Sequence, residues 1–363
     1  RWEGVWGSGR TWCCVFFVCC YGAPRDLHSY PTRRASDLKP LTHTVWESRQ
    51  LGLALKETKV ATQMGNQVHA SDSLRGTIDY LRSGAIGELE EAHVWTNRPI
   101  WRQGMAVPEG GQDVPENMDW ESWIGPAGMR PFRREPADGW GGFYHPFNWR
   151  GFWDFGCGAL GDMACHNMDP LYWAMEPGFP TEVELVDGEA FGDAPMYEKN
   201  TTVRFRFPAK GERPGFDAYW HDGGNKPDRP EEMAEGETLP NQGALYIGTE
   251  GKLYAAGDSR NWPKLLPDSR NEEQGLPEQQ IERSKEGHHK EWYLACTGEE
   301  AYDFPKCNFS YAAPFTEMVL LGCIAQRVGG KLVYDPKEMV FEGREDATAL
   351  ITKEYREGWD FSL

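Results

Sequence analysis

The stretch NTTVRFRFP, residues 200–208, carries the alternation that decides the fold class. Val203, Phe205 and Phe207 fall on one face of an extended chain, and Arg204 and Arg206 fall on the other. FDAYWHD alternates in the same way, and ALYIGTEGKLYAAG indicates a hairpin that turns at Glu250 and Gly251. These short strands predict an open, mostly antiparallel sheet with one face covered.

The chain before this sheet has a different pattern, typical of the second half of a parallel α/β unit. Either Thr42 or Thr44 can cap a first helix. KVATQMGNQ, residues 59–67, predicts a strand that runs into a loop, and Ser71 can cap a second helix that stops before Gly84. We therefore expect an α/β protein that begins with part of a parallel unit.

Composition limits the classes of function. The 363 residues carry a net charge of −18, which argues against a nucleic-acid-binding protein, because such proteins need a basic surface. The apolar run around Val15 to Val18 is too short to span a bilayer, so we expect no membrane insertion. The nine cysteines show no metal-binding or disulfide spacing, and the cellular location, cytoplasmic or exported, stays open.

The stretch GALGDMACHNMD, residues 158–169, carries the candidate chemistry. Asp162, His166 and Asp169 are spaced i, i+4 and i+7, so one continuous helix would present all three on one face. A carboxylate beside an imidazole suits acid/base catalysis near neutral pH. A structural histidine and a metal site are the alternatives, although no HExxH or CxxC pattern supports a metal. Asp169 precedes Pro170 and could instead cap a following turn.

Several collinear segments together resemble the Gfo/Idh/MocA oxidoreductases, the family of glucose–fructose oxidoreductase and inositol dehydrogenase. KPLTHTVWESRQL resembles the segment after the family's Glu-Lys-Pro motif, and VATQMGNQVHA and LRSGAIGELEEAHVWTNRPIW resemble its strand, helix and domain crossover. YHPFNWRGFWDFGCGALGDMACHNMDPLYWAM resembles its Gly-rich turn and DxxxHxxD helix, and GTEGKL and HHKEWYLACTG resemble a later hairpin and helix. The resemblance extends over about nine-tenths of the chain.

The resemblance implies two domains and a nicotinamide cofactor, NAD or NADP. Residues 39–88 would be the remnant of a Rossmann domain, and residues 89–363 would be the substrate and oligomerisation domain. Lys39, Asp162 and His166 would be catalytic, with His166 exchanging the proton of the reacting hydroxyl. The remaining expected contacts are Lys39, Pro40, Asn66 and Gln67 to the cofactor, and His69, His145, Trp149, Arg150 and Asp169 to the substrate. For His145, Trp149 and Arg150, structural packing of the loop is the alternative.

The N-terminal segment departs from this pattern. Only 38 residues precede Lys39, none of them matches the family's first βαβ units or Gly-rich loop, and Leu38 stands where the family has Glu. HSYPTRRASDL resembles a translated sequencing adapter, so we interpret residues 1–38 as a non-family segment, disordered or artefactual, with a genuine divergent extension as the alternative. A chain truncated in this way is expected to bind NAD poorly.

The sequence thus predicts an NAD(P)-dependent oxidoreductase acting on a secondary hydroxyl of a sugar, glycoside or cyclitol. The alternatives are a redox-assisted glycosidase and a non-catalytic sugar-binding fragment. The expected partners are a small carbohydrate or cyclitol and further copies of the chain, joined through the sheet of the second domain.

Overall fold

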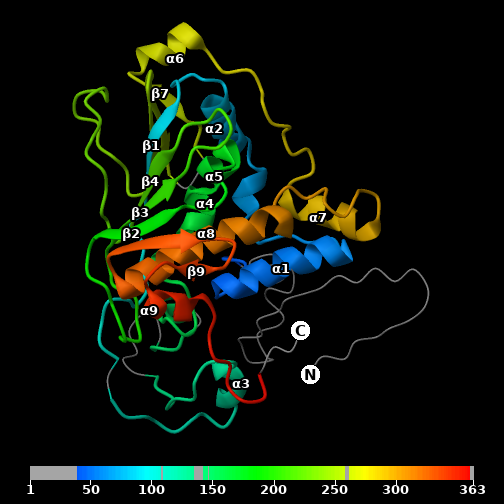
Figure 1. The fold of residues 1–363 in the computed structure, drawn as a ribbon, viewed down its shortest axis with the longest axis vertical. Helices are drawn as coiled ribbons and strands as arrows, with labels where there is room; N and C mark the ends of the chain where they lie inside the picture. The colour runs from blue at the N-terminus through cyan, green and yellow to red at the C-terminus, as the bar shows by residue number, and fades with distance from the viewer. Residues whose placement is uncertain (1–38, 108, 135–141, 146, 258–260, 360–363) are drawn as a thin grey trace.

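The computed structural model describes residues 39–107, 109–134, 142–145, 147–257 and 261–359. The segment interpreted as non-family, residues 1–38, lies outside these residues. The main helices lie on one side of a single large sheet (Figure 1). The α-helices are α1 (Val45–Thr58), α2 (Asp72–Arg82), α3 (Trp120–Ile124), α4 (Gly158–Asn167), α5 (Asp169–Met175), α6 (Ser269–Gln274), α7 (His288–Thr297), α8 (Phe309–Val328) and α9 (Glu345–Thr348), with 3-10 helices η1 (Gln67–Ala70), η2 (Asn148–Gly151) and η3 (Ala349–Ile351).

The sheet has nine strands in the order β7-β6-β5-β1-β4-β3-β2-β8-β9. Its neighbouring strands run antiparallel except for β1 and β4, which are parallel. This confirms the predicted α/β class with an open, mostly antiparallel sheet. The strands are β1 (Leu89–Trp95), β2 (Glu182–Asp187), β3 (Thr202–Phe207), β4 (Phe216–His221), β5 (Gly243–Gly248), β6 (Gly251–Ala256), β7 (Lys264–Leu266), β8 (Lys331–Asp335) and β9 (Val340–Phe341).

The alternation in β3 is realised as predicted. Val203 and Phe205 are fully buried, whereas Arg206 on the opposite face is exposed. The β5–β6 hairpin forms one residue earlier than expected, because Gly248 pairs with Gly251 and leaves Thr249 and Glu250 as the turn.

Helix α8 covers the buried face of the sheet and separates it from α1 (Figure 1). Most of its side chains are buried, which is the pattern of a helix enclosed on all sides. The helix approaches β3 so closely that a Cβ atom on Gly322 would lie 2.6 Å from Cζ of Phe205. A glycine at this position therefore brings α8 against the sheet.

The two N-terminal helices begin as the sequence predicts. Thr44 caps α1 in a reciprocal capping box with Glu47, and the Ser71 hydroxyl accepts a hydrogen bond from the Leu74 amide at the start of α2. The strand predicted over residues 59–67 is wrong. Its backbone is bonded to the backbone of a distant described segment at one point, where the Met64 amide lies 3.0 Å from the Cys307 carbonyl, because no described strand lies beside it to complete a ladder.

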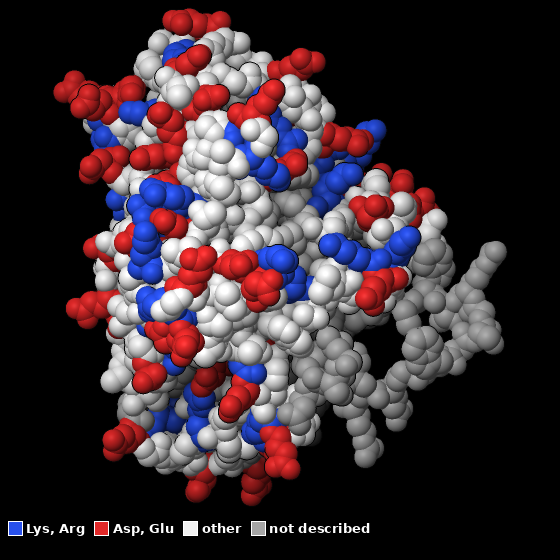
Figure 2. Space-filling view, viewed as in Figure 1, with Lys and Arg blue, Asp and Glu red and all other residues white. Residues whose placement is uncertain are grey.

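Helices α1 and α2 share one apolar core with the residues that follow them. α1 packs against α8, and α2 packs against α5. The boundary predicted between residues 88 and 89 stays a prediction. On the face seen in Figure 2, acidic and basic side chains are intermixed.

A carboxyl group that pairs with no cation of the described residues is enclosed between β4 and α8. Asp222 is fully buried and accepts hydrogen bonds from Thr201, Trp220 and Gln326 at 2.7 to 3.2 Å. Burial raises its pKa from an ordinary value of 3.8 to about 7. Because the folded state holds this proton more tightly than the unfolded state, the contribution of Asp222 to stability is largest below about pH 4 and falls as the pH rises through 7.

We therefore expect the Asp222→Asn variant to lose less stability than the wild type between about pH 5 and pH 8, by about 3 kcal/mol. Urea denaturation at each pH measures the difference. The Asp187→Asn variant, at an exposed carboxylate, serves as the control and keeps the wild-type dependence on pH. Equal pH slopes for Asp222→Asn and wild type would contradict the assignment.

Candidate active site

The predicted Asp162–His166–Asp169 helix is interrupted. α4 ends at Asn167, and α5 begins at Asp169 with Pro170 in its first turn. Proline has no N–H to bond the carbonyl four residues earlier, which favours a break in the helix at this position. The prediction that one helix presents all three side chains on one face is therefore wrong. Asp162 and His166 stay one turn apart and partly exposed, whereas Asp169 is directed into the core.

Two cations hold the Asp162 carboxylate. Nζ of Lys39 lies 2.7 Å from Oδ1 of Asp162 and 2.5 Å from its backbone carbonyl oxygen, and Nε of Arg150 lies 3.1 Å from the same Oδ1. Burial opposes ionisation of Asp162, but Lys39 and Arg150 outweigh it, and the nearby His166 adds to their effect. Together they hold the pKa of Asp162 below its usual range. The site therefore contains a permanent carboxylate between two permanent cations.

Arg150 is itself fixed by aromatic rings. Its guanidinium lies over Phe147 and Trp149 at 5.2 and 5.3 Å, and over Trp101 at 5.9 Å. The second of these rings belongs to η2, the turn that leads towards α4. Cation–π contacts of this kind restrict the orientation of a guanidinium.

His166 is held from the other side by Asn66. Nδ1 of His166 lies 2.7 Å from Oδ1 of Asn66. The Asn66 amide nitrogen donates to the Cys165 carbonyl at 2.6 Å and to Oδ2 of Asp169 at 2.8 Å. The three contacts use both ends of the Asn66 amide.

Asp169 is the centre of a buried cluster. Nδ1 of His69 lies 2.9 Å from its Oδ2, and the Tyr311 hydroxyl donates to its Oδ1. His69 stacks on Trp173 with ring centroids 3.8 Å apart. The side chains of His69, Asn66 and Asp169 have no exposed surface. In this structure they face the protein interior and not a solvent-accessible ligand site.

The other predicted contacts lie at or near the surface. His145 is exposed, and Trp149 and Arg150 are partly exposed. Gln67 begins η1, and Pro40 packs against α4, since a Cβ on Gly161 would lie 3.6 Å from its Cγ. The sequence reasoning missed Tyr311, because nothing local in the sequence links a residue of α8 to Asp169.

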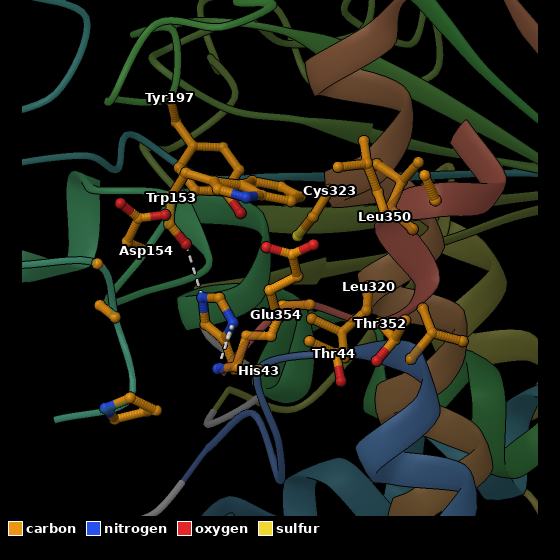
Figure 3. A pocket seen from close by; sticks show the side chains of 17 residues that line it. His43, Thr44, Trp153, Asp154, Tyr197, Leu320, Cys323, Leu350, Thr352 and Glu354 are labelled. Carbon is orange, nitrogen blue, oxygen red and sulfur yellow. Dashed lines mark hydrogen bonds between the residues drawn. The ribbon is translucent and has the colours of Figure 1, made fainter. Parts of the chain in front are cut away.

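A separate cavity of about 290 Å³ lies beyond His43 and does not include Lys39, Asp162 or His166. Figure 3 shows Trp153, Tyr197 and Glu354 around it. His43 donates from Nε2 to the Trp153 carbonyl at 2.6 Å, and burial, assisted by Lys353, lowers its pKa to about 4. The catalytic candidates therefore lie outside this cavity. Among the described residues, no cluster of three His, Cys, Asp or Glu side chains could hold a metal, and no helix is long and apolar enough to cross a membrane.

The sheet and the Lys39–Asp162–His166 cluster define an α/β protein with a possible acid/base site. Residues 92–206, from β1 to β3, match the Gfo/Idh/MocA family model described as "Oxidoreductase family, C-terminal alpha/beta domain". This part of the chain therefore matches the C-terminal domain of the Gfo/Idh/MocA oxidoreductases, which confirms the resemblance found in the sequence.

Solved structures of the same type are distant from this chain. WlbA dehydrogenase from Chromobacterium violaceum, in complex with NADH and UDP-GlcNAcA, is 15% identical over 82% of this chain and 70% of its own, with a TM-score of 0.48. Aldose-aldose oxidoreductase from Caulobacter crescentus, complexed with glycerol, is 13% identical over 86% and 77%, with a TM-score of 0.45. A levoglucosan dehydrogenase complexed with NADH and levoglucosan is 15% identical over 81% and 72%, with a TM-score of 0.43. No curated protein matches the chain.

Replacing Lys39 by methionine removes the nearer cation from Asp162. We expect the pKa of Asp162 to rise, because desolvation then meets less opposition. Carbon-13 NMR titration of the carboxyl group measures this rise. Since the wild-type pKa is depressed, the stabilisation that the pair gives is present above about pH 4 and is lost as the pH falls below it.

The matched control is Lys353→Met. This lysine contacts His43 and Glu47, not Asp162. The Asp162 titration should therefore stay at its wild-type position in the control. A similar shift in both variants would show that Lys39 has no specific effect.

Proposed function

We propose that this chain is an NAD(P)-dependent oxidoreductase that transfers hydride between a secondary hydroxyl of a sugar, glycoside or cyclitol and nicotinamide. The observation that carries the proposal is the juxtaposition of Lys39 and Asp162, 2.7 Å apart, with His166 one turn further along α4. An alcohol oxidation needs a base for the hydroxyl proton and a cation near the developing alkoxide. Both groups are present, and both are partly exposed.

The described residues fit the reacting end of such a cofactor and not its phosphate end. Lys39 and His166 offer a cation and an imidazole where proton and hydride would be exchanged. Asn66, expected as a cofactor contact, is buried and already bonded at both ends of its amide. No Gly-rich strand–turn–helix for a pyrophosphate occurs in the part of the chain that is described. We therefore expect weak cofactor binding.

The roles of the side chains follow from their charges. His166 accepts the hydroxyl proton, and Lys39 stabilises the negative charge that develops on the oxygen. Asp162 stabilises the resulting imidazolium and is kept ionised by Lys39 and Arg150. The chemistry that a bound nicotinamide supplies is acceptance of the hydride from the same carbon.

Substrate contacts are assigned to the partly exposed side of this cluster. We retain His145, Trp149 and Arg150 as contacts, since the aromatic and guanidinium groups beside Asp162 suit a polyhydroxylated ligand. His69 and Asp169, predicted as substrate contacts, are buried and bonded to each other, so we no longer assign them to the substrate.

The His166→Ala variant tests the function. We expect turnover of a sugar or cyclitol panel, followed by the absorbance of reduced nicotinamide at saturating NAD or NADP, to fall by roughly 10²- to 10⁴-fold. The His289→Ala variant removes an exposed histidine of α7 and should keep wild-type activity. Normal turnover in His166→Ala would refute the acid/base assignment.

The same assays separate the alternatives. Release of an aglycone without net cofactor reduction would indicate a redox-assisted glycosidase. Sugar binding that survives His166→Ala, with no oxidation product at any cofactor concentration, would indicate a non-catalytic sugar-binding protein.

We also propose that copies of the chain associate through the open face of the sheet. This face carries Arg204 paired with Glu184 at 2.5 Å, and Arg206 paired with Asp217 at 3.0 Å. Tyr219 lies between them and the His93 ring, on which it stacks at 4.8 Å. A wide face with partly exposed aromatic and charged groups is suited to a symmetric contact.

A Tyr219→Arg substitution adds a cation at the centre of this face. We expect light scattering after size-exclusion chromatography to show an oligomer for the wild type and a smaller species for the variant. A Lys337→Glu variant, at an exposed position after β8, should keep the wild-type mass. A monomeric wild type would contradict the proposal.

A further inference from the structure

We infer that Asn66 is a positioning residue that fixes the tautomer of His166, with the proton of the neutral ring on Nδ1. The sequence assigned Asn66 to the cofactor and gave the orienting role to Asp162. The geometry gives contact with Nδ1 of His166 to Asn66, at 2.7 Å.

The orientation of the Asn66 amide is set by its surroundings. Its nitrogen lies 2.6 Å from the Cys165 carbonyl oxygen and 2.8 Å from Oδ2 of Asp169, and both partners act as acceptors. If the amide were turned over, its oxygen would face these two oxygens, and two hydrogen bonds would be replaced by repulsions. Asn66 has no exposed surface, so water cannot compensate for such a loss.

The tautomer of His166 follows from that orientation. With the nitrogen directed at Cys165 and Asp169, Oδ1 of Asn66 faces the imidazole. An amide oxygen can only accept a hydrogen bond, so Nδ1 of His166 must donate one. The neutral ring then carries its lone pair on Nε2, and Nε2 is the atom that can take a proton.

Asp169 keeps Asn66 in place because it is surrounded by donors. Its Oδ2 also receives Nδ1–H of His69 at 2.9 Å, and its Oδ1 receives the Tyr311 hydroxyl. Because these groups donate to Asp169, its carboxylate also acts as an acceptor for the Asn66 amide. Buried clusters of this type hold their members in one arrangement when every hydrogen bond is made.

The hydrogen bonds therefore form a series. His69 and Tyr311 bond to Asp169, Asp169 bonds to Asn66, and Asn66 bonds to His166. Only His166 at the end of this chain reaches the partly exposed site. That Nε2 meets the substrate hydroxyl rests on the proposed function, whereas the tautomer itself does not. The tautomer can therefore be measured separately from the proposed activity.

Nitrogen-15 NMR of the imidazole side chains tests the tautomer directly, without cofactor or turnover. The spectra are recorded at about pH 8.5, where an ordinary imidazole is neutral, and a His166→Gln variant identifies the His166 signals. We expect the wild type to show Nδ1 as the protonated nitrogen and Nε2 as the unprotonated one. A wild-type His166 protonated on Nε2 would overturn the inference, whether or not any variant folds.

The Asn66→Ala variant removes the acceptor. We expect its His166 signals to change to a mixture of the two tautomers or to the Nε2–H form, and kcat to fall roughly 10²-fold with a smaller change in KM. The control is Asn167→Ala, which removes a buried asparagine next to His166 whose amide bonds the Trp95 carbonyl instead. The control should keep the wild-type tautomer.

An unchanged tautomer in folded Asn66→Ala, or the same change in Asn167→Ala, would refute the positioning role. Absence of hydride transfer in the wild type, with the Nδ1–H tautomer present, would refute the proposed function alone.

Discussion

The need to satisfy one buried carboxylate organises the candidate site. Asp169 has no exposed surface and forms no ion pair with a lysine or arginine of the described residues, so hydrogen-bond donors must replace the water it loses. Those donors come from two separate parts of the chain: η1 with its N-cap Asn66, and α8. Asp169 thereby ties the N-terminal segment to the long helix that covers the sheet. The same hydrogen bonds fix the position of Asn66, and Asn66 in turn fixes the position of His166.

The site combines two electrostatic environments. Around Asp162, two permanent cations stabilise the charged form of a carboxylate. At His166, the neutral amide of Asn66 contacts Nδ1 and thereby fixes where the proton of the ring lies. This contact brings no full charge to Nδ1. α4 carries both groups one turn apart and ends at Asn167, before Asp169 enters the buried cluster. The division is useful for acid/base chemistry, because the group that moves a proton and the group that stays ionised have different hydrogen-bond partners.

Local signals in the sequence were sufficient for much of the fold. The alternation in β3 and the capping residues Thr44 and Ser71 act over a few neighbouring positions, and each forms as predicted. The strand predicted over residues 59–67 failed because a strand depends on a neighbour that a local pattern cannot supply. In the site, the signal for the break at Pro170 was present, but the i, i+4, i+7 spacing was given more weight. The contacts of Asp169 with His69 and Tyr311 join positions about a hundred or more residues apart, which no local pattern encodes.

The parallel pairing of β1 with β4 also has a consequence for how the chain folds. Glu91 lies opposite Asp217, so α4 and α5, with Asp162 and His166, are contained in the crossover between these two strands. Closing so long a segment costs chain entropy before the contacts between β1 and β4 can stabilise it. Folding rates fall as such non-local contacts accumulate. The centre of the sheet is therefore expected to form late. Asp162 and His166 should acquire their final arrangement only in the last steps of folding, together with the core that supports them.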